Sequence, residues 1–207
     1  MSKYTVSKAS LSDLPAFTAC QFRAFANGPL HAIIFPNPTD AKERHTKAIV
    51  DDGDEVVFLK ATDDSTGDIV GGIKWCFYRR GYDYTTGTAR PSPESYSTEN
   101  GAYRQDVLNA IVQKRVEMVT GPHALLDLLF TDPDHQHQGI GSQLVHWGCG
   151  EADRTNMTAI VEASPAGRRM YEKHDFVVHE FSNLKLEQWS DKPLLPQYFM
   201  VRQSRPR

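Results

Sequence analysis

Hydrophobic and polar positions follow two periods along this chain, and the changes of period mark the expected elements. Alternating or short continuous apolar runs predict strands at 4–8, 56–61, 69–78, 125–131, 158–162, 176–186 and 198–202. Apolar residues spaced by three or four predict helices that begin after Ser10 or Ser12, at Thr39, near Tyr103, near Ile140 and at Ser164. We therefore expect an alternation of strands and helices along the whole chain.

The order of these elements predicts a mixed α/β (α+β) fold. Two neighbouring strands joined by the polar loop 63–67 indicate an antiparallel first half, and strand–helix–strand units follow it. We expect a central mixed sheet of six or seven strands with flanking helices, parallel crossovers in its second half, and one domain over 1–207. Residues 79–101 interrupt the pattern as an irregular insertion. This insertion is either a surface excursion or an acceptor-site lid carrying Tyr82, Tyr84 and Tyr96 beside Tyr78.

The most informative stretch is 125–144, LLDLLFTDPDHQHQGIGSQL. An apolar strand ends in a turn containing Pro133, and Gln136, Gly139 and Gly141 precede an apolar-periodic helix. The unpaired N–H groups and the positive dipole end of a helix start attract anions, and glycines let a phosphate approach the backbone. The alternative is a glycine turn that binds nothing. The pattern lacks the Gly-Lys-Ser/Thr of a Walker loop and the three glycines of a dinucleotide fingerprint.

The spacing Gln136-x-x-Gly139-x-Gly141 after a strand and a proline turn resembles the coenzyme A loop of the GNAT superfamily of N-acetyltransferases. A second stretch, SPAGRRMYEKHDFV at 164–177, is similar to the helix that follows the fifth strand in that superfamily. In this sequence Ser164 occupies the position where the superfamily usually has Asn, and Asp175 the position where it usually has Gly. The first stretch also looks like small fungal members. The resemblance implies a GNAT fold and direct acetyl transfer from acetyl-CoA to an amine.

The resemblance also implies which residues meet acetyl-CoA. Backbone amides of 138–142 would hold the pyrophosphate, and the end of the strand would pair with the pantetheine arm. An N–H near Leu129 would stabilise the thioester oxygen. The expected cofactor contacts are Leu129, Phe130, Thr131, Gln136, His137, Gln138, Gly139, Ile140, Gly141, Ser142 and Ser164.

Two side chains are candidates for acid–base chemistry. Tyr171 matches the tyrosine that protonates the leaving thiolate in the family, and the alternative is a ring that only packs against the sheet. Asp127, a carboxylate within an apolar strand, is the candidate base for the attacking amine, against a structural Asp. Its alternate-residue spacing from Leu125 and Leu129 would place it toward the same cleft. Glu162 is a weaker alternative. Cys149 would support a covalent route, but its position within a helix favours a buried core residue.

Composition argues against several other classes of protein. The net charge of −3 argues against a dedicated nucleic-acid binder. The odd number of cysteines, three, argues against a disulfide framework, and the histidines form no recognisable metal motif. No apolar run has the length of a signal peptide core or a membrane span, so we expect a cytoplasmic protein that uses neither membrane nor metal. A homodimer is an open alternative.

The leading hypothesis is an acetyl-CoA-dependent N-acetyltransferase that acts on the primary amine of a small molecule. The acidic balance and the long insertion favour this acceptor over a protein or peptide amine, which would need an open groove. A coenzyme A-binding sensor without catalysis is the alternative from a different class.

Overall fold

The computed structural model describes residues 3–84 and 99–205, which fold around one seven-stranded sheet. The strands are β1 (Tyr4–Lys8), β2 (Val56–Asp63), β3 (Ile69–Tyr78), β4 (His123–Thr131), β5 (Thr158–Ala163), β6 (Val177–Ser182) and β7 (Gln197–Arg202). The helices are α1 (Leu14–Ala24), α2 (Pro29–Ile34), α3 (Pro38–Asp51), α4 (Glu99–Met118), α5 (Ile140–Arg154) and α6 (Arg168–Glu172). The predicted mixed α/β class is confirmed.

The strands lie in the order β1-β2-β3-β4-β5-β7-β6. Strands β1 to β4 pair antiparallel, β4 and β5 pair parallel, and β7 pairs antiparallel with both β5 and β6. The predicted antiparallel first half is confirmed. The parallel crossovers expected in the second half are present, because β5 follows β4 through α5 and β6 follows β5 through α6 in the same direction. The sequence did not predict that β7 lies between β5 and β6.

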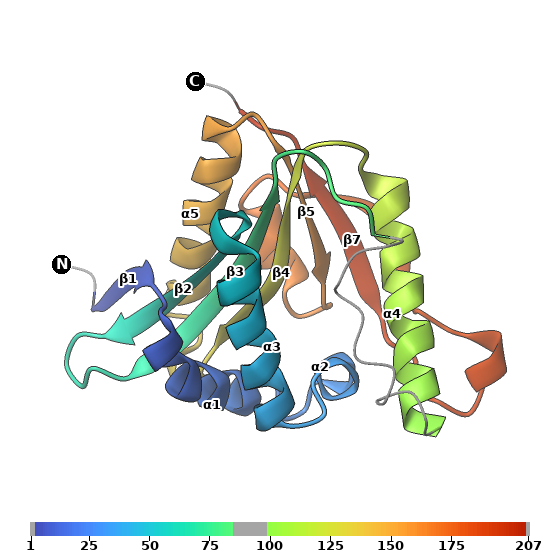
Figure 1. Ribbon diagram of the computed structural model, residues 1–207, viewed down its shortest axis with the longest axis horizontal. Helices are drawn as coiled ribbons and strands as arrows, with labels where there is room; N and C mark the ends of the chain where they lie inside the picture. The colour runs from blue at the N-terminus through green and yellow to red at the C-terminus, as the bar shows by residue number, and fades with distance from the viewer. Residues whose placement is uncertain (1–2, 85–98, 206–207) are drawn as a thin grey trace.

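Helices cover both faces of the sheet (Figure 1). On one face α5 packs its buried stripe against the strands, in a core that contains Trp75, Leu144 and Tyr171. On the other face α1 and α3 pack over β2 to β4, with Phe17, Phe58 and Phe130 in contact. Helix α4 packs a third cluster against β7 and the segment before it. We call the face under α1, α3 and α4 the α1 face, and the opposite one the α5 face.

Several boundaries differ from the sequence predictions. The cap of α3 is Asn37, whose side chain accepts a 2.9 Å hydrogen bond from the amide of Asp40, so Thr39 is not the cap. Helix α6 begins at Arg168 rather than near Ser164, because Ser164 to Gly167 first forms a hydrogen-bonded turn. The strand expected over 176–186 ends at Ser182, and Leu184 follows with a positive φ of 44°. Tyr96 of the predicted lid lies outside the described residues.

None of the helices in the described ranges is long and apolar enough to cross a lipid bilayer. The three cysteines are buried and unpaired.

Candidate functional site

The parallel strands β4 and β5 separate part-way along their length. Their pairing joins His123–Leu126 to Thr158–Val161, whereas β4 continues to Thr131 and β5 to Ala163. Beyond the pair Leu126 and Val161, no strand among residues 3–84 and 99–205 lies opposite the backbone edge of β4 that faces β5. This opening supplies free backbone donors and acceptors in the middle of a sheet, where an extended ligand can pair.

A bulge in β4 lies at the same point. Lys74 of β3 is opposite Leu128 and Trp75 is opposite Leu126, so Asp127 has no partner in β3. The extra residue changes the side-chain alternation. Leu125 packs in the core of the α1 face, whereas Leu129 packs against the core of the α5 face. The expectation that Asp127 shares its direction with both leucines is therefore wrong, because the bulge breaks the two-residue period between them.

The end of β4 leads into the glycine loop as predicted. Gln136, His137, Gln138 and Gly139 are exposed, and Gly139 takes a φ of 83°, which only glycine adopts without strain. Gly139 is the N-cap of α5 and no side chain caps it. The first hydrogen bond of α5 runs from the amide of Gln143 to the carbonyl of Gly139. The preceding amides, of Ile140, Gly141 and Ser142, are thus available to an anion at the positive end of a 15-residue helix.

The predicted cofactor residues lie around this loop and the end of β4, but their side chains do not all point toward the start of α5. A side chain at Gly141 would meet Thr131 Oγ1 at 3.7 Å and Leu129 Cδ2 at 4.0 Å, so these two point toward the start of α5. Phe130 instead packs its ring on Phe17 in the α1 face, with ring centres 4.8 Å apart. Only the backbone of Phe130 can therefore line the opening.

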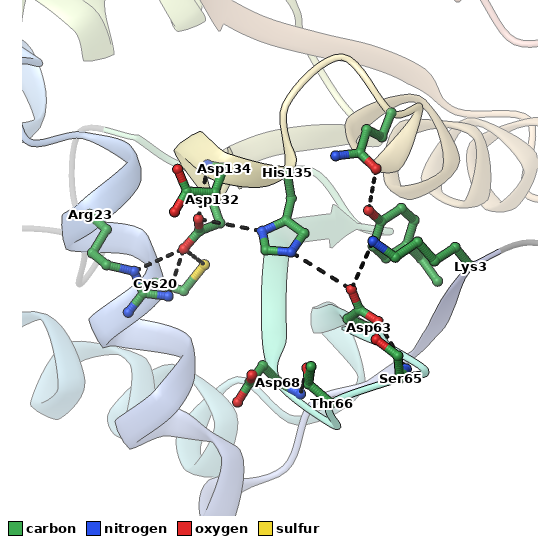
Figure 2. A network of polar contacts seen from close by, with 12 residues as sticks. Lys3, Cys20, Arg23, Asp63, Ser65, Thr66, Asp68, Asp132, Asp134 and His135 are labelled. Carbon is green, nitrogen blue, oxygen red and sulfur yellow. Dashed lines mark hydrogen bonds and ion pairs between the residues drawn. The ribbon is translucent and has the colours of Figure 1, made fainter.

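Polar contacts hold the turn before the loop from three sides (Figure 2). Arg23 of α1 donates a 2.8 Å hydrogen bond from Nε to Asp132, and its Nη2 lies 2.6 Å from the same carboxylate oxygen. The ring of His135 lies between two buried carboxylates, with Nδ1 3.5 Å from Asp132 and Nε2 3.7 Å from Asp63. Lys3 pairs with Asp63 from the other side at 3.3 Å. We call these five residues the loop anchor.

A second charged network spans the separation of the strands on the α1 face. Arg115 of α4 donates two 2.8 Å hydrogen bonds to Glu162 of β5, and its Nη2 lies 3.4 Å from Asp127 of β4. Lys74 of β3 donates a 2.8 Å hydrogen bond to Asp127. We call Lys74, Arg115, Asp127 and Glu162 the central network. It connects the first residue of each strand beyond their last pair.

The central network changes the proton chemistry of Asp127. Burial alone would raise the pKa of this carboxyl, but the charges of Lys74 and Arg115 outweigh burial and hold the pKa well below its usual range. A carboxylate with so low a pKa is a weak proton acceptor. The assignment of Asp127 as general base stays a prediction, and its ion pairs favour an electrostatic role.

Tyr171 lies on the α5 face, 7% exposed, with its ring edge against Phe176 at a centroid distance of 5.9 Å. Burial, and then the charge of Glu162, raise its pKa above the ordinary value. The hydroxyl therefore keeps its proton at neutral pH. Within the described part of the chain no residue forms a hydrogen bond with that hydroxyl, so it is free to donate to a ligand.

The remaining predicted residues sit beside the loop. Ser142 hydrogen bonds at 2.8 Å through Oγ to His174 Nε2 and so ties α5 to the end of α6. Exposed Ser164 follows β5 and accepts a 3.2 Å hydrogen bond from the amide of Gly167. His137 and His146 are exposed. Cys149 is buried, as predicted, and burial raises the pKa of its thiol to about 11.

Sequence reasoning did not identify Lys74, Arg115 or the loop anchor. Lys74 interrupts the otherwise apolar and glycine-rich strand 69–78, and a lysine there was a signal of the same kind as Asp127. Arg115 and His135 carried no such signal, because helix and turn positions tolerate charge.

A cavity of about 430 Å³ lies away from this site, toward the other end of the sheet. Its lining includes Phe58, Phe77, Trp147 and Glu151, and no residue of the glycine loop. We locate the candidate site from the strand separation and the helix start instead.

A seven-stranded mixed sheet that separates between parallel strands beside a glycine loop defines a class, the acetyltransferase fold of the GNAT superfamily. Residues 102–178 match the family model described as Acetyltransferase (GNAT) domain. This part of the chain thus matches a GNAT acetyltransferase domain, and the resemblance inferred from the sequence is confirmed.

Solved structures extend the likeness of fold to the whole chain. A structure described as histone acetyltransferase HPA2 and related acetyltransferase, from Corynebacterium glutamicum, is 22% identical with a TM-score of 0.63, over 100% of this chain and 99% of that one. A mosquito arylalkylamine N-acetyltransferase like 5b is 15% identical with a TM-score of 0.69, over 97% and 99%. A putative acetyltransferase from Salmonella typhimurium, solved with its cofactor acetyl-CoA, is 17% identical with a TM-score of 0.62, over 99% and 96%. No curated protein matches the chain by sequence.

Proposed function

We propose that this protein is an acetyl-CoA-dependent N-acetyltransferase that transfers the acetyl group directly to the primary amine of a small molecule. The observation that carries the proposal is the separation of β4 and β5 directly beside the uncapped start of α5. The unpaired backbone edge of β4 suits the amides of a pantetheine arm, and the amides of Ile140, Gly141 and Ser142 suit the pyrophosphate of the same cofactor. The β4 edge and the start of α5 both offer backbone groups, so they can hold the cofactor without charged side chains.

The reaction needs three operations from the chain. The amine nitrogen forms a bond to the thioester carbonyl carbon, and an N–H of β4 near Leu129 stabilises the oxyanion that results. The carbon–sulfur bond then breaks, and Tyr171 donates its proton to the departing thiolate. The amine loses its proton to water, because the ion pairs of Asp127 leave it a poor acceptor.

A solvent-accessible opening on the α1 face supports a small acceptor that approaches from that side. The side chains of Lys74 and Asp127 belong to central strands, yet 18% and 26% of their surfaces are exposed. Residues in the middle of a covered sheet reach solvent only where the covering helices leave a gap. Asp127 directly follows the last residue of β4 that pairs with β5, so this exposed surface lies beside the strand separation, where the thioester would lie.

An acceptor panel tests the function. Acetyl-CoA is offered with small primary amines, with lysine-containing peptides and with no acceptor, and release of the thiol is followed. We expect turnover with small amines that exceeds the rate without acceptor by at least a hundredfold. Preference for peptides would overturn the small-molecule assignment. Binding of coenzyme A with no turnover of any acceptor would favour the sensor.

Two glycines, one at the N-cap of α5 and one within the helix, provide a variant and its control for this assay. Gly139→Val introduces a β-branched residue at a left-handed position, and Gly150→Ala changes an exposed glycine within the same helix. We expect turnover to fall only in the first.

A further inference from the structure

The ring of His135 has a carboxylate beside each of its two nitrogens. Nδ1 lies 3.5 Å from Oδ1 of Asp132, in the turn that leads to the glycine loop, and Nε2 lies 3.7 Å from Oδ2 of Asp63, at the end of β2. Only 7% of the Asp132 side chain and 4% of the Asp63 side chain are exposed. The ring therefore lies between the turn and the β2–β3 hairpin (Figure 2).

This arrangement suits one protonation state of the ring, because a carboxylate can only accept hydrogen bonds. Neutral imidazole has one N–H, so its other nitrogen is an acceptor that would face a carboxylate oxygen with no proton between them. The imidazolium has an N–H on each nitrogen and a positive charge for both carboxylates. Nδ1 of His135 is buried, and the described residues provide no hydrogen-bond partner for it. The geometry favours the imidazolium.

The two carboxylates stay charged across the pH range in which histidines titrate. Hydrogen bonds from the hydroxyl and the amide of Ser65, with Lys3 in support, hold the pKa of Asp63 at about 2. Burial would raise the pKa of Asp132, but the hydrogen bond from Arg23 outweighs burial and lowers this pKa. A change of pH between 6 and 8.5 therefore alters the ring and not its two carboxylates.

Two cations bind the same carboxylates on the sides away from the ring (Figure 2). Lys3 lies 3.3 Å from Asp63, and Nη2 of Arg23 lies 2.6 Å from Asp132. Neither cation lies between a carboxylate and His135, so both ring nitrogens keep their carboxylate neighbours. The other charged or titratable groups of the hairpin and the turn are exposed, namely Asp64, Asp68, Asp134 and His137.

Two further titratable side chains lie close to this cluster, from α1 and β1. The thiol of Cys20 is 3.9 Å from Asp132, and burial raises its pKa to about 12, so the thiol stays neutral. Tyr4 presents its ring edge to His135, with ring centres 6.2 Å apart. The hydroxyl of Tyr4 donates a hydrogen bond to Gln138 in the glycine loop. The surroundings of the histidine ring are thus connected to the loop itself.

The glycine loop depends on support at its first end. Residues 136–139 join His135 to Ile140, where α5 begins. Within them His137 and Gly139 have positive φ angles of 60° and 83°, and a left-handed backbone is strained for any residue other than glycine. A short strained segment keeps its shape when both ends are fixed. Helix α5 fixes one end, and the contacts of His135 fix the other.

We propose that His135 is a positioning residue for the coenzyme A loop and that it acts in its protonated form. The imidazolium joins Asp132 to Asp63 and so holds the turn before the loop against the β2–β3 hairpin. When the ring loses its proton, one of the two contacts becomes a repulsion between an acceptor nitrogen and a carboxylate. Coenzyme A should therefore bind more tightly as pH falls and more weakly as pH rises. This inference rests on the proposed function, since it concerns the cofactor site of that function.

Calorimetric titration with coenzyme A at pH 6 and at pH 8.5 tests the inference. The phosphates of coenzyme A also titrate, so the comparison is made between proteins and not between pH values alone. We expect the ratio of the two affinities to be about fivefold larger in the wild type than in His135→Gln. His179→Gln, which changes an exposed histidine of the edge strand β6, is the matched control and should behave like the wild type.

Nitrogen NMR of the histidine rings measures the protonation state directly in the wild type. The signals of His135 are assigned through their connection to its backbone, so this measurement does not depend on a folded variant. We expect both ring nitrogens to carry protons at pH 6. Because linkage is reciprocal, we also expect coenzyme A to increase the protonated fraction at pH 7.5. A role in packing alone would produce neither result.

The outcomes separate the inference from the function beneath it. The same pH dependence in the wild type and in His135→Gln overturns the positioning role and leaves the cofactor site intact. A His135 ring with one protonated nitrogen at pH 6 also overturns it, as does a protonated fraction that coenzyme A leaves unchanged. Failure of the wild type to bind coenzyme A at either pH would instead overturn the transferase itself.

Discussion

The guanidinium of Arg115 forms a two-pronged ion pair with Glu162 at the point where β4 and β5 separate, with both hydrogen bonds 2.8 Å long. Its Nη2 also approaches Asp127, 3.4 Å away on the other strand. One side chain from α4 therefore connects both strands where the sheet opens. Arg115 thus gives the two strands a shared side-chain partner just beyond their last backbone pair.

Arg115→Met should destabilise the fold, because it leaves two carboxylates without their shared cation. Removal of one partner from a buried ion pair costs about 3–5 kcal/mol, and the side chain of Arg115 is only 13% exposed. Urea denaturation measures the free energy of unfolding. Arg154→Met is the control, since Arg154 is 68% exposed and pairs with Glu151 within one helix, and such pairs contribute about 0–1 kcal/mol. Equal losses in the two variants would contradict the bridging role.

Tyr171→Phe should lower kcat and leave the affinity for coenzyme A nearly unchanged. The hydroxyl is the proposed proton donor to the thiolate, and general acid catalysis contributes about 10²- to 10⁴-fold. The ring, which packs against Phe176, is retained. Steady-state kinetics and calorimetry together provide the test. Phe176→Leu, which changes the side chain that packs against this ring, serves as the control. It should lower the free energy of unfolding and have little effect on kcat. An unaltered kcat in Tyr171→Phe would remove Tyr171 as the acid.

The stability of the fold should decrease as pH falls from 7 to 5. Gln21 hydrogen bonds to His31 at 2.9 Å and to His45 at 2.8 Å, and all three are buried. Burial lowers the pKa of His31 to about 4 and, with help from the charge of Lys74, that of His45 to about 3, from 6.5. Below pH 6.5 the unfolded chain gains protons that the folded protein cannot take. Each histidine then costs up to about 2 kcal/mol by pH 5.

Urea denaturation at pH 7 and at pH 5 checks this prediction. The variant His31→Gln should reduce the difference in stability between the two pH values, whereas His146→Gln, at an exposed position, should not. Stability that is constant from pH 7 to 5 would contradict the assignment of neutral buried histidines.

The loop anchor should control coenzyme A binding. Asp132→Ala removes the carboxylate that receives Arg23 and faces His135, so the turn before Gln136 loses its tie to α1. We expect the dissociation constant for coenzyme A to rise about tenfold. The control is Asp134→Ala, because exposed Asp134 offers its backbone amide rather than its side chain to Asp132. Equal affinities in both variants would show that the loop does not need the anchor.

The fold class and the conformation of the glycine loop were predictable for a local reason. Strand ends, turns and helix starts depend on neighbours in the sequence, so Pro133, Gly139 and Gly141 carried the signal by themselves. The strand order was harder to predict from the sequence, because the pairing of β7 between β5 and β6 joins residues far apart in the chain.

The acid–base assignments were limited by contacts that no local pattern encodes. Asp127 was found as a carboxylate in an apolar strand, but its partners come from β3 and α4, 53 and 12 residues away. The bulge that leaves Asp127 on the α1 face with Leu125 but turns Leu129 to the α5 face is visible only in the register with β3. A two-residue alternation read from β4 alone therefore assigned Leu129 to the wrong face.

Titration of the wild-type protein with coenzyme A in a calorimeter tests the central claim most directly. We predict one molecule bound per chain, and a dissociation constant at least tenfold weaker in Gly139→Val, where a β-branched residue must adopt the φ of 83° at a cost of about 1–2 kcal/mol. Gly150→Ala should bind like the wild type. No binding to the wild type, or the same affinity in Gly139→Val, would contradict the assignment of this loop as the cofactor site.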